Sequence, residues 1–180
     1  QVRSLILSDD ITEKGRRQLL ALLARVGNAD DMQTVFSHAI RDPQLLELLP
    51  AIAKGRRLTP SGSIHDNLEI LLTHKRVAVR AAAVRLAGLW NQRQLIPLLE
   101  PMLQGEDDLV LAATIRSFGD LSPNSAVEEL QPFITITQPQ SVVLAALEAV
   151  GQKDINIAAI AGITLLSKRD NDDTIALVLS

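Results

Sequence analysis

The amino-acid sequence predicts an all-α fold, a right-handed α-α superhelix (a solenoid) of about five helical hairpins. Of the 180 residues, 47% are hydrophobic and only 2% aromatic. Because Leu, Ala, Ile and Val carry the apolar content, helices are favoured over sheets. Glycines also recur at a nearly constant spacing, and an apolar segment of helical length precedes each of them. We therefore expect residues 1–180 to form a single repeat domain.

The segments that precede the recurring glycines align with one another. The glycines lie 28, 33, 31 and 32 residues apart: Gly27, Gly55, Gly88, Gly119 and Gly151. Seven, six and four positions before each glycine, every residue is apolar, a spacing that places these residues on one buried face of a helix. The position three before the glycine changes from apolar to charged along the chain, and we expect it to face outward in the later repeats: Ala24, Ile52, Arg85, Arg116 and Glu148.

The helix ends can also be predicted. Glycine enters the left-handed conformation that commonly follows a last helical turn, so we expect each recurring glycine to end a helix. Second apolar segments of similar length follow, at residues 30–40, 64–72, 94–103, 125–134 and 155–166. Their neighbours include side chains suited to capping helix starts: Asp30, Asp108, Ser125 and Asp154. Each of three prolines removes a helical hydrogen bond, so helices are expected to kink or end there: Pro97, Pro101 and Pro132. Residues 55–63, GRRLTPSGS, are expected to form an irregular loop.

Residues 67–90, NLEILLTHKRVAVRAAAVRLAGLW, resemble HEAT repeats, helical hairpins of the armadillo-like class whose second helix opens with a Val-Arg-x-Ala-Ala-like string. In the next two repeats Leu111 and Val143 stand where this pattern has Arg80. The resemblance is strong over residues 64–151 and weak outside them. It implies a solenoid fold and little chemistry of its own. It also implies that Arg80 bonds to the turn of an adjacent repeat.

The string VRAAAVRLAGLW is also similar to helical-repeat segments of large bacterial multidomain proteins. In those proteins a dehydrogenase-like propeller is joined to a c-type cytochrome domain. This narrower likeness implies a spacer or docking domain of a haem-binding protein, with the redox chemistry outside these residues and a periplasmic location; otherwise we expect a soluble cytoplasmic protein. Because the chain begins with Gln1 and closes on the apolar string IALVLS, we expect a fragment of a longer chain.

No residue pattern in the sequence indicates catalysis or a cofactor. Without cysteine there is no thiolate metal site and no thiol nucleophile. His38, His65 and His74 show no metal-binding spacing and no partner carboxylate four residues away that forms a ready site, and residues 170–174, DNDDT, lack the glycine and glutamate of a calcium loop. Neither a phosphate-binding glycine motif nor a G-x-S-x-G motif occurs. We therefore predict a segment that is not an enzyme and takes no cofactor, metal or small-molecule substrate.

Charge is distributed unevenly along the chain. Residues 1–93 hold 14 Lys and Arg against 9 Asp and Glu, whereas residues 94–180 hold 4 against 12. The basic half suggests nucleic-acid binding as one alternative function. The acidic half would repel a phosphate backbone, and the few aromatic residues argue against base stacking, so we do not expect nucleic acid as the partner. No apolar run approaches the ~18 residues of a membrane helix, so we expect no membrane insertion.

The first function hypothesis is therefore a non-catalytic protein-binding or scaffolding module. An extended surface without convergent polar groups suits a macromolecule better than a small substrate. The partner is expected to be another protein or other domains of the same chain. The candidate interaction surface combines the outward column with nearby cationic and aromatic residues: Arg76, Arg80, Arg85, Trp90, Arg116 and Glu148. The alternatives are the spacer domain of a haem-binding protein and nucleic-acid binding through the basic half.

Overall fold

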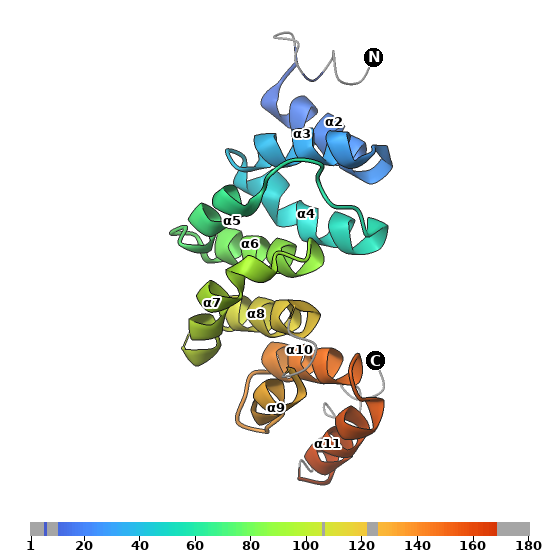
Figure 1. The fold of residues 1–180 in the computed structure, drawn as a ribbon, viewed down its shortest axis with the longest axis vertical. Coiled ribbons are helices and arrows are strands. Elements are labelled where there is room, and N and C mark those ends of the chain that lie inside the picture. Colours follow the sequence, from blue (N-terminus) through green and yellow to red (C-terminus); the bar gives the residue numbers. More distant parts are fainter. Residues whose placement is uncertain (1–5, 7–10, 106, 122–125, 169–180) are drawn as a thin grey trace. The chain divides into compact units, whose positions relative to one another are not determined.

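The computed structural model describes residue 6 and residues 11–105, 107–121 and 126–168. Within these ranges the chain consists of α-helices and short 3-10 helices joined by turns, and it contains no β-strand. The all-α prediction is therefore confirmed. The chain divides into two compact units, Gln1–Trp90 and Asn91–Ser180 (Figure 1). A bilayer-spanning helix is absent from the described ranges.

Unit 1 contains five helices (counted over its described residues): α2 (Glu13–Val26), α3 (Ala29–Ala39), α4 (Pro43–Arg56), α5 (His65–Leu72) and α6 (Val77–Leu89). The three helices that precede or contain the recurring glycines pack in succession, α2 on α4 and α4 on α6. Between them, α3 packs against α2 and α4, and α5 packs against α6. The alternation of the two helix types is the hairpin arrangement that the repeat pattern predicts.

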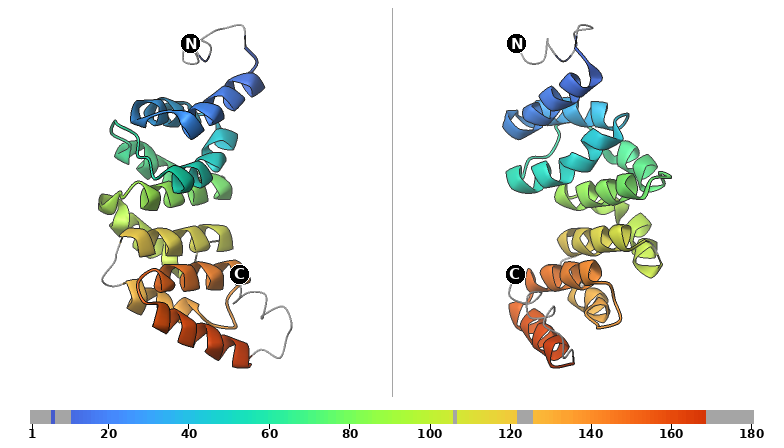
Figure 2. Two further views of the ribbon diagram at one scale, coloured as in Figure 1. Left: turned by 90° about the vertical axis from the view of Figure 1, so that its right-hand side faces the viewer. Right: turned by 180° about the vertical axis from the view of Figure 1, so that it is seen from behind.

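Unit 2 repeats this alternation. It contains the short helices η1 (Arg93–Leu95), α7 (Ile96–Leu99) and η2 (Glu100–Gln104), followed by α8 (Asp108–Leu121), α9 (Ala126–Leu130), η3 (Gln131–Phe133), α10 (Gln140–Gly151) and α11 (Ile155–Lys168). Helices α8 and α10 lie side by side, and α9 packs against both of them (Figure 2). Helix α11 packs against α10.

Two of the three prolines and one predicted cap act as expected. Helix α7 ends directly before the 3-10 helix that contains Pro101, and α9 ends directly before the 3-10 helix that contains Pro132. The prediction for Pro97 is wrong, because Pro97 lies in the first turn of α7, where a missing amide hydrogen costs no helical bond. The Asp154 carboxylate accepts hydrogen bonds from the Asn156 and Ile157 amides, at 2.9 and 3.1 Å, and so caps α11.

Two other predicted caps are wrong by one or two residues. Helix α3 is capped by Asn28 instead of Asp30; Asn28 forms a reciprocal capping box with Asp31. Helix α8 already includes Asp108, and the preceding Asp107 carboxylate accepts from the Leu109 amide at 3.0 Å. In both cases the side chain of a residue earlier in the sequence than the predicted cap accepts a hydrogen bond from a backbone amide in the first turn of the helix. The fourth predicted cap, Ser125, lies outside the described residues, as do the acidic residues 170–174.

None of the recurring glycines adopts the left-handed conformation, and only Gly27 and Gly151 end helices as predicted. Gly55, Gly88 and Gly119 lie inside helices and Gly151 is the last residue of one; Gly27 follows α2 in an extended conformation. Instead, Gly119 allows a close approach between helices. A Cβ atom built on Gly119 would lie 2.7 Å from the Cβ of Ala149, nearer than two carbon atoms can come. At this position the repeat requires glycine for interhelical contact, not for backbone conformation.

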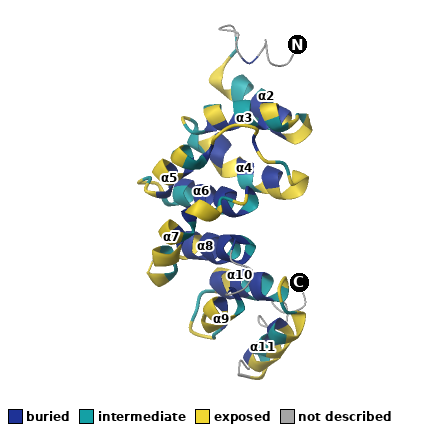
Figure 3. Ribbon diagram, in the orientation of Figure 1, coloured by how far each residue is buried: buried dark blue, intermediate teal, exposed yellow. Residues whose placement is uncertain are grey.

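The predicted apolar stripe is buried in α6 and α8 but shifted in α4. Ala82 and Ala113 are 6% and 7% exposed, and most of α8 is buried in Figure 3. In α4, however, Leu48 is 46% exposed, whereas Ile52 is buried. Counting back from Gly55 therefore selects residues on a different face of α4 from the buried one. The outward column is confirmed for the later repeats, because Arg85, Arg116 and Glu148 are half-buried while Ala24 and Ile52 are buried.

Each unit has an aliphatic core with few aromatic residues. In unit 1 the side chains of Phe36, Leu49 and Leu68 have no exposed area, and in unit 2 Ile115, Leu130 and Val142 are equally buried. Burying one such side chain contributes about 1.5–3 kcal/mol of hydrophobic free energy. Small residues complete the packing, since Ala145, Ala146 and Ala149 of α10 are at most 2% exposed and allow helices to approach closely.

Candidate functional site

The cationic residues at the start of α6 are tied to neighbouring residues. Arg76 is the N-terminal flanking residue of α6, and its guanidinium donates to Glu47 of α4 at 2.9 Å. The Arg76 amide donates to Nδ1 of His74 at 3.1 Å, which fixes the turn before the helix. The two side chains of the ion pair are 49% and 34% exposed. Arg76 therefore lies at the surface and also links α4 to α6.

Arg80 has a structural role. Its guanidinium donates to the backbone oxygen of His74 at 3.0 Å, and its contact with the Lys75 oxygen is longer, at 3.4 Å. The resemblance to HEAT repeats implied a bond from Arg80 to the turn of an adjacent repeat. The bonds to His74 and Lys75 are made to the turn that leads into the same helix, and the bond to an adjacent repeat stays a prediction. Arg85, one turn further along α6, is half-buried.

Trp90 belongs to the core, which corrects its place on the candidate interaction surface. Its side chain is 2% exposed. The indole Nε1 donates to the backbone oxygen of Leu58 at 3.1 Å, and the ring meets that of Phe36 edge-on. A buried indole with a satisfied N–H stabilises the fold and is not available to a partner.

The loop between α4 and α5 explains why Trp90 is covered. In this loop the Ser61 amide donates to the Ala29 oxygen at 3.2 Å, and the Gly62 amide donates to the Gln33 side chain at 3.1 Å. Both acceptors lie on α3. Because the same loop supplies the Leu58 oxygen to Trp90, it connects the start of α3 to the end of α6. The sequence predicted an irregular loop but not these contacts.

Arg116 and Glu148 form the clearest pair within the predicted column. Nε of Arg116 on α8 donates to Oε2 of Glu148 on α10 at 2.8 Å, with the side chains 30% and 35% exposed. The two residues are 32 positions apart, one repeat length, and they occupy the same column. They belong to unit 2, whereas Arg76, Arg80 and Arg85 belong to unit 1. The structure therefore brings Arg116 and Glu148 together in one unit, and Arg76 and Arg80 in the other.

A further ion pair was not predicted. Nε of Arg17 on α2 donates to Oδ2 of Asp42, the residue that caps α4, at 2.6 Å, and the same guanidinium contacts Gln44. Burial raises the pKa of Asp42. Hydrogen bonds from the Arg17 side chain and from the amides of Leu45 and Gln44 outweigh that effect and lower the pKa below its ordinary value. The carboxylate is thus held in its charged form between two helices.

The described residues contain no cluster of three or more side chains able to hold a metal ion. The histidines lie apart, on α3, at the start of α5 and in the turn before α6. The prediction that no histidine has a partner carboxylate four residues away is wrong for His65, whose Nε2 lies 3.8 Å from Oε2 of Glu69. This is a single exposed pair on one helix face, a common way of stabilising helices.

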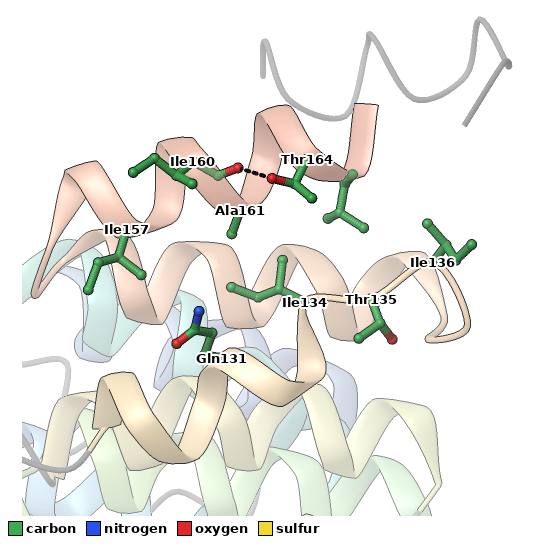
Figure 4. Close-up of a pocket in the computed structure, with 9 residues that line it drawn as sticks. Gln131, Ile134, Thr135, Ile136, Ile157, Ile160, Ala161 and Thr164 are labelled. Atoms are coloured by element: carbon green, nitrogen blue, oxygen red, sulfur yellow. Dashed lines mark hydrogen bonds between the residues drawn. The ribbon is translucent and has the colours of Figure 1, made fainter. Parts of the chain in front are cut away.

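Unit 2 also contains an apolar groove that the sequence did not predict. It lies between α11 and residues 131–136 and has a volume of about 520 Å³. In Figure 4, Ile157 and Ala161 line it from α11, and Ile134 and Ile136 line it from the opposite side. The nearby hydroxyls are already paired: Thr164 donates to the Ile160 oxygen, and Thr135 bonds to Thr137. The groove is thus suited to packing of apolar side chains.

Residues 64–151 match the family model of HEAT repeats. These bounds are those over which the sequence resemblance is strong, and they run from α5 to the end of α10. HEAT repeats generally mediate protein–protein interaction or scaffolding and are typically not enzymes. The match gives no support to the narrower likeness to dehydrogenase and cytochrome proteins or to nucleic-acid binding. Comparisons with curated proteins and with solved structures found no match.

Proposed function

We propose that this chain is a non-catalytic protein-binding module, with its partner contacting the outward column of the HEAT segment. The observation that carries the proposal is the HEAT match over the helices whose outward residues are Arg85, Arg116 and Glu148. These side chains are half-buried, so part of each remains accessible to a partner. Arg76 is also accessible, but Trp90 is excluded by its burial.

Support also comes from the charge of the two units. Unit 1 holds 13 Lys and Arg against 9 Asp and Glu, and unit 2 holds 5 against 12. The division of the chain after Trp90 thus nearly coincides with the change of sign that the sequence shows. A partner with charged patches of both signs suits this distribution, since complementary charge steers association and selects partners. The partner can be a separate protein or another domain of the same chain.

The test compares two charge-reversal variants with equal net charge. Arg85→Glu/Arg116→Glu changes the outward column in both units. Arg25→Glu/Arg93→Glu changes one exposed arginine in each unit outside the column. Arg80 is left intact because it holds the turn before α6.

Each variant and the parent are used to capture proteins from the source cell, and the retained proteins are quantified by mass spectrometry. We expect a set retained by the parent and by the control variant but lost with the column variant, while all three keep the same helical circular dichroism. Equal retention by the column variant contradicts the assignment of the face. Loss with both variants would show that net charge, not the column, governs binding.

A further inference from the structure

Unit 2 contains another cleft, which differs from the apolar groove because two carboxylates line it. The cleft lies between η2 and the segment formed by α9 and η3, and it has a volume of about 540 Å³. Glu100 is the first residue of η2, and Glu129 is the next-to-last residue of α9. Both side chains are exposed. The other residues that line the cleft are Leu103, Gln104, Pro132 and Phe133.

Two prolines in successive repeats shape this cleft. Pro101 is the second residue of η2, and Pro132 is the second residue of η3. A proline ends the α-helix before it, and in both repeats the chain continues as a 3-10 helix. The cleft therefore opens between two irregular helix ends. In Figure 1, α7 and α9 lie to the left of α8 and α10, so the cleft belongs to the other helices of the hairpins from those that carry the outward column.

The two carboxylates of the cleft are not neutralised within the described part of unit 2. Neither Glu100 nor Glu129 forms an ion pair or a side-chain hydrogen bond with another described residue. Residues 94–150 hold eight Asp and Glu but one basic residue, Arg116, and Arg116 is paired with Glu148. Like charges in one cleft repel each other, and a cation between them relieves that repulsion. Such a cation must come from outside residues 94–150.

The rest of the wall suits the aliphatic part of a long basic side chain. Phe133 is half-buried, packs against the core of unit 2 and also lines the cleft. Leu103 and Pro132 extend this apolar wall. Lysine and arginine pack their methylene groups on apolar surface while their charged heads stay in polar surroundings. An aromatic ring attracts the charged head as well. The wall thus matches both parts of a basic side chain.

We propose that this cleft binds a lysine or arginine side chain from an exposed basic segment of a partner protein. The charged head lies between Glu100 and Glu129, and the methylene groups pack on Leu103, Pro132 and Phe133. The proposal does not depend on the proposed function, because the outward column lies on α6, α8 and α10 and shares no residue with the cleft. Failure of either site leaves the other to be tested separately.

Peptide titration of the full chain tests the proposal. The probe is a short glycine–serine peptide with two arginines and blocked ends, and its control carries glutamines in place of the arginines. Amide NMR spectra of the isotope-labelled chain report both the binding constant and the residues that respond. Increasing salt should weaken binding of the arginine peptide, because the carboxylates are exposed.

Two variants with the same change of net charge locate the effect. Glu100→Gln/Glu129→Gln removes both charges from the cleft and keeps the size of the side chains. Asp108→Asn/Glu128→Gln is the matched control, since both residues are exposed in unit 2 and neither lines the cleft. Circular dichroism and denaturant titration check that each variant folds like the parent.

We expect the arginine peptide to shift the amide resonances of Leu103, Gln104 and Phe133, and the glutamine peptide to leave them in place. Loss of two exposed ion pairs should raise the Kd of the cleft variant about 2- to 30-fold, whereas the control variant should bind like the parent. Equal affinity of the cleft variant and the parent would overturn the proposal. An equal loss in both variants would overturn it too, since the overall charge of unit 2 would then attract the peptide.

Two further measurements separate a basic side chain from other occupants. Phe133→Leu keeps an apolar side chain against the core but removes the ring, and we expect it to raise the Kd of the arginine peptide about 2- to 5-fold. Calcium chloride is titrated alone as the rival cation. Calcium that shifts the same resonances at a lower concentration than the peptide would overturn the proposal in favour of a metal ion. Equal shifts with the glutamine peptide would overturn it in favour of an uncharged ligand.

Discussion

Trp90, the last residue of unit 1, meets Phe36 of α3 edge-on, with ring centroids 5.1 Å apart and an angle of 84° between the ring planes. These two residues are half of the aromatic side chains in the chain, which has one tryptophan and three phenylalanines. An edge-on pair gains about 0.5–1.5 kcal/mol beyond its burial. Since the indole also donates to Leu58, Trp90 anchors α6, α3 and the loop between α4 and α5 at one point.

The burial of Trp90 predicts its fluorescence. As the only tryptophan, it reports directly on its own surroundings. In the native state we expect Trp90 to fluoresce at short wavelength and to be protected from quenching by acrylamide. Both properties should be lost on unfolding. Trp90→Phe keeps an apolar ring but removes the donor to Leu58, and it should lower the free energy of unfolding by about 0.5–1.5 kcal/mol. Trp90→Ala should lower it by about 3–5 kcal/mol. Long-wavelength, easily quenched native emission would contradict the core assignment.

The pair between Arg17 and Asp42 predicts a dependence of stability on pH. Asp42→Asn keeps an oxygen that accepts from the first amides of α4, so it removes the charge and retains the cap. At pH 7 we expect it to lower the free energy of unfolding by about 0.2–1 kcal/mol, the usual range for a part-exposed ion pair. Denaturant titrations of parent and variant measure the difference.

The sign of the pH effect follows from the lowered pKa of Asp42. A carboxyl whose pKa is lower in the folded state stabilises the protein above its unfolded pKa of about 3.9. That contribution is lost as the pH falls through the folded value. The parent and Asp42→Asn should therefore converge in acid. A difference that stays constant from pH 7 to pH 3 would mean that the charge of Asp42 is not involved.

The contact between Arg116 and Glu148 predicts coupling between residues one repeat apart. A double-mutant cycle with Arg116→Ala and Glu148→Ala should give an interaction energy of about 0.2–1 kcal/mol. High salt should reduce it, because both side chains are partly exposed and their attraction is screened. Purely additive effects of the two substitutions at low salt would show that the ion pair contributes nothing in solution.

Local signals in the sequence predicted much of the fold. The apolar period located the helices, and the prolines located the ends of α7 and α9, because both features act within a few residues. The Asn28 cap had such a signal too, a polar residue with Asp31 three positions later, but it was missed. Counting back from Gly55 gave the wrong face of α4, because the position of this glycine relative to the buried face differs from that of Gly88 and Gly119.

Contacts between residues that are far apart in the chain could not be predicted from the sequence. Nothing near Trp90 indicates that the loop at Leu58 covers it, because the two residues are 32 positions apart. For the same reason the pairs of Arg17 with Asp42 and of Arg76 with Glu47 were not predicted. Arg116 and Glu148 were assigned to one column from the repeat alone, but their direct bond required the structure.

Helices α8 and α10 of successive repeats touch at Gly119. Two glycine substitutions, for which we expect opposite changes in stability, test this contact. Gly119→Ala places a Cβ 2.7 Å from that of Ala149, and overpacking of this kind costs about 1–3 kcal/mol. Gly55→Ala is the matched control, because a Cβ there has no neighbour within 4 Å. Inside a helix, replacing glycine by alanine alone gains about 0.8–1.0 kcal/mol.

The most direct measurement is therefore the free energy of unfolding of Gly119→Ala, Gly55→Ala and the double variant Gly119→Ala/Ala149→Gly, each compared with its background by denaturant titration. We predict that Gly119→Ala destabilises the parent, that Gly55→Ala stabilises it, and that Gly119→Ala is no longer destabilising once Ala149 has become glycine. If Gly119→Ala stabilises the protein as much as Gly55→Ala does, α8 and α10 do not meet at Gly119 and the stacking of successive repeats described above is wrong.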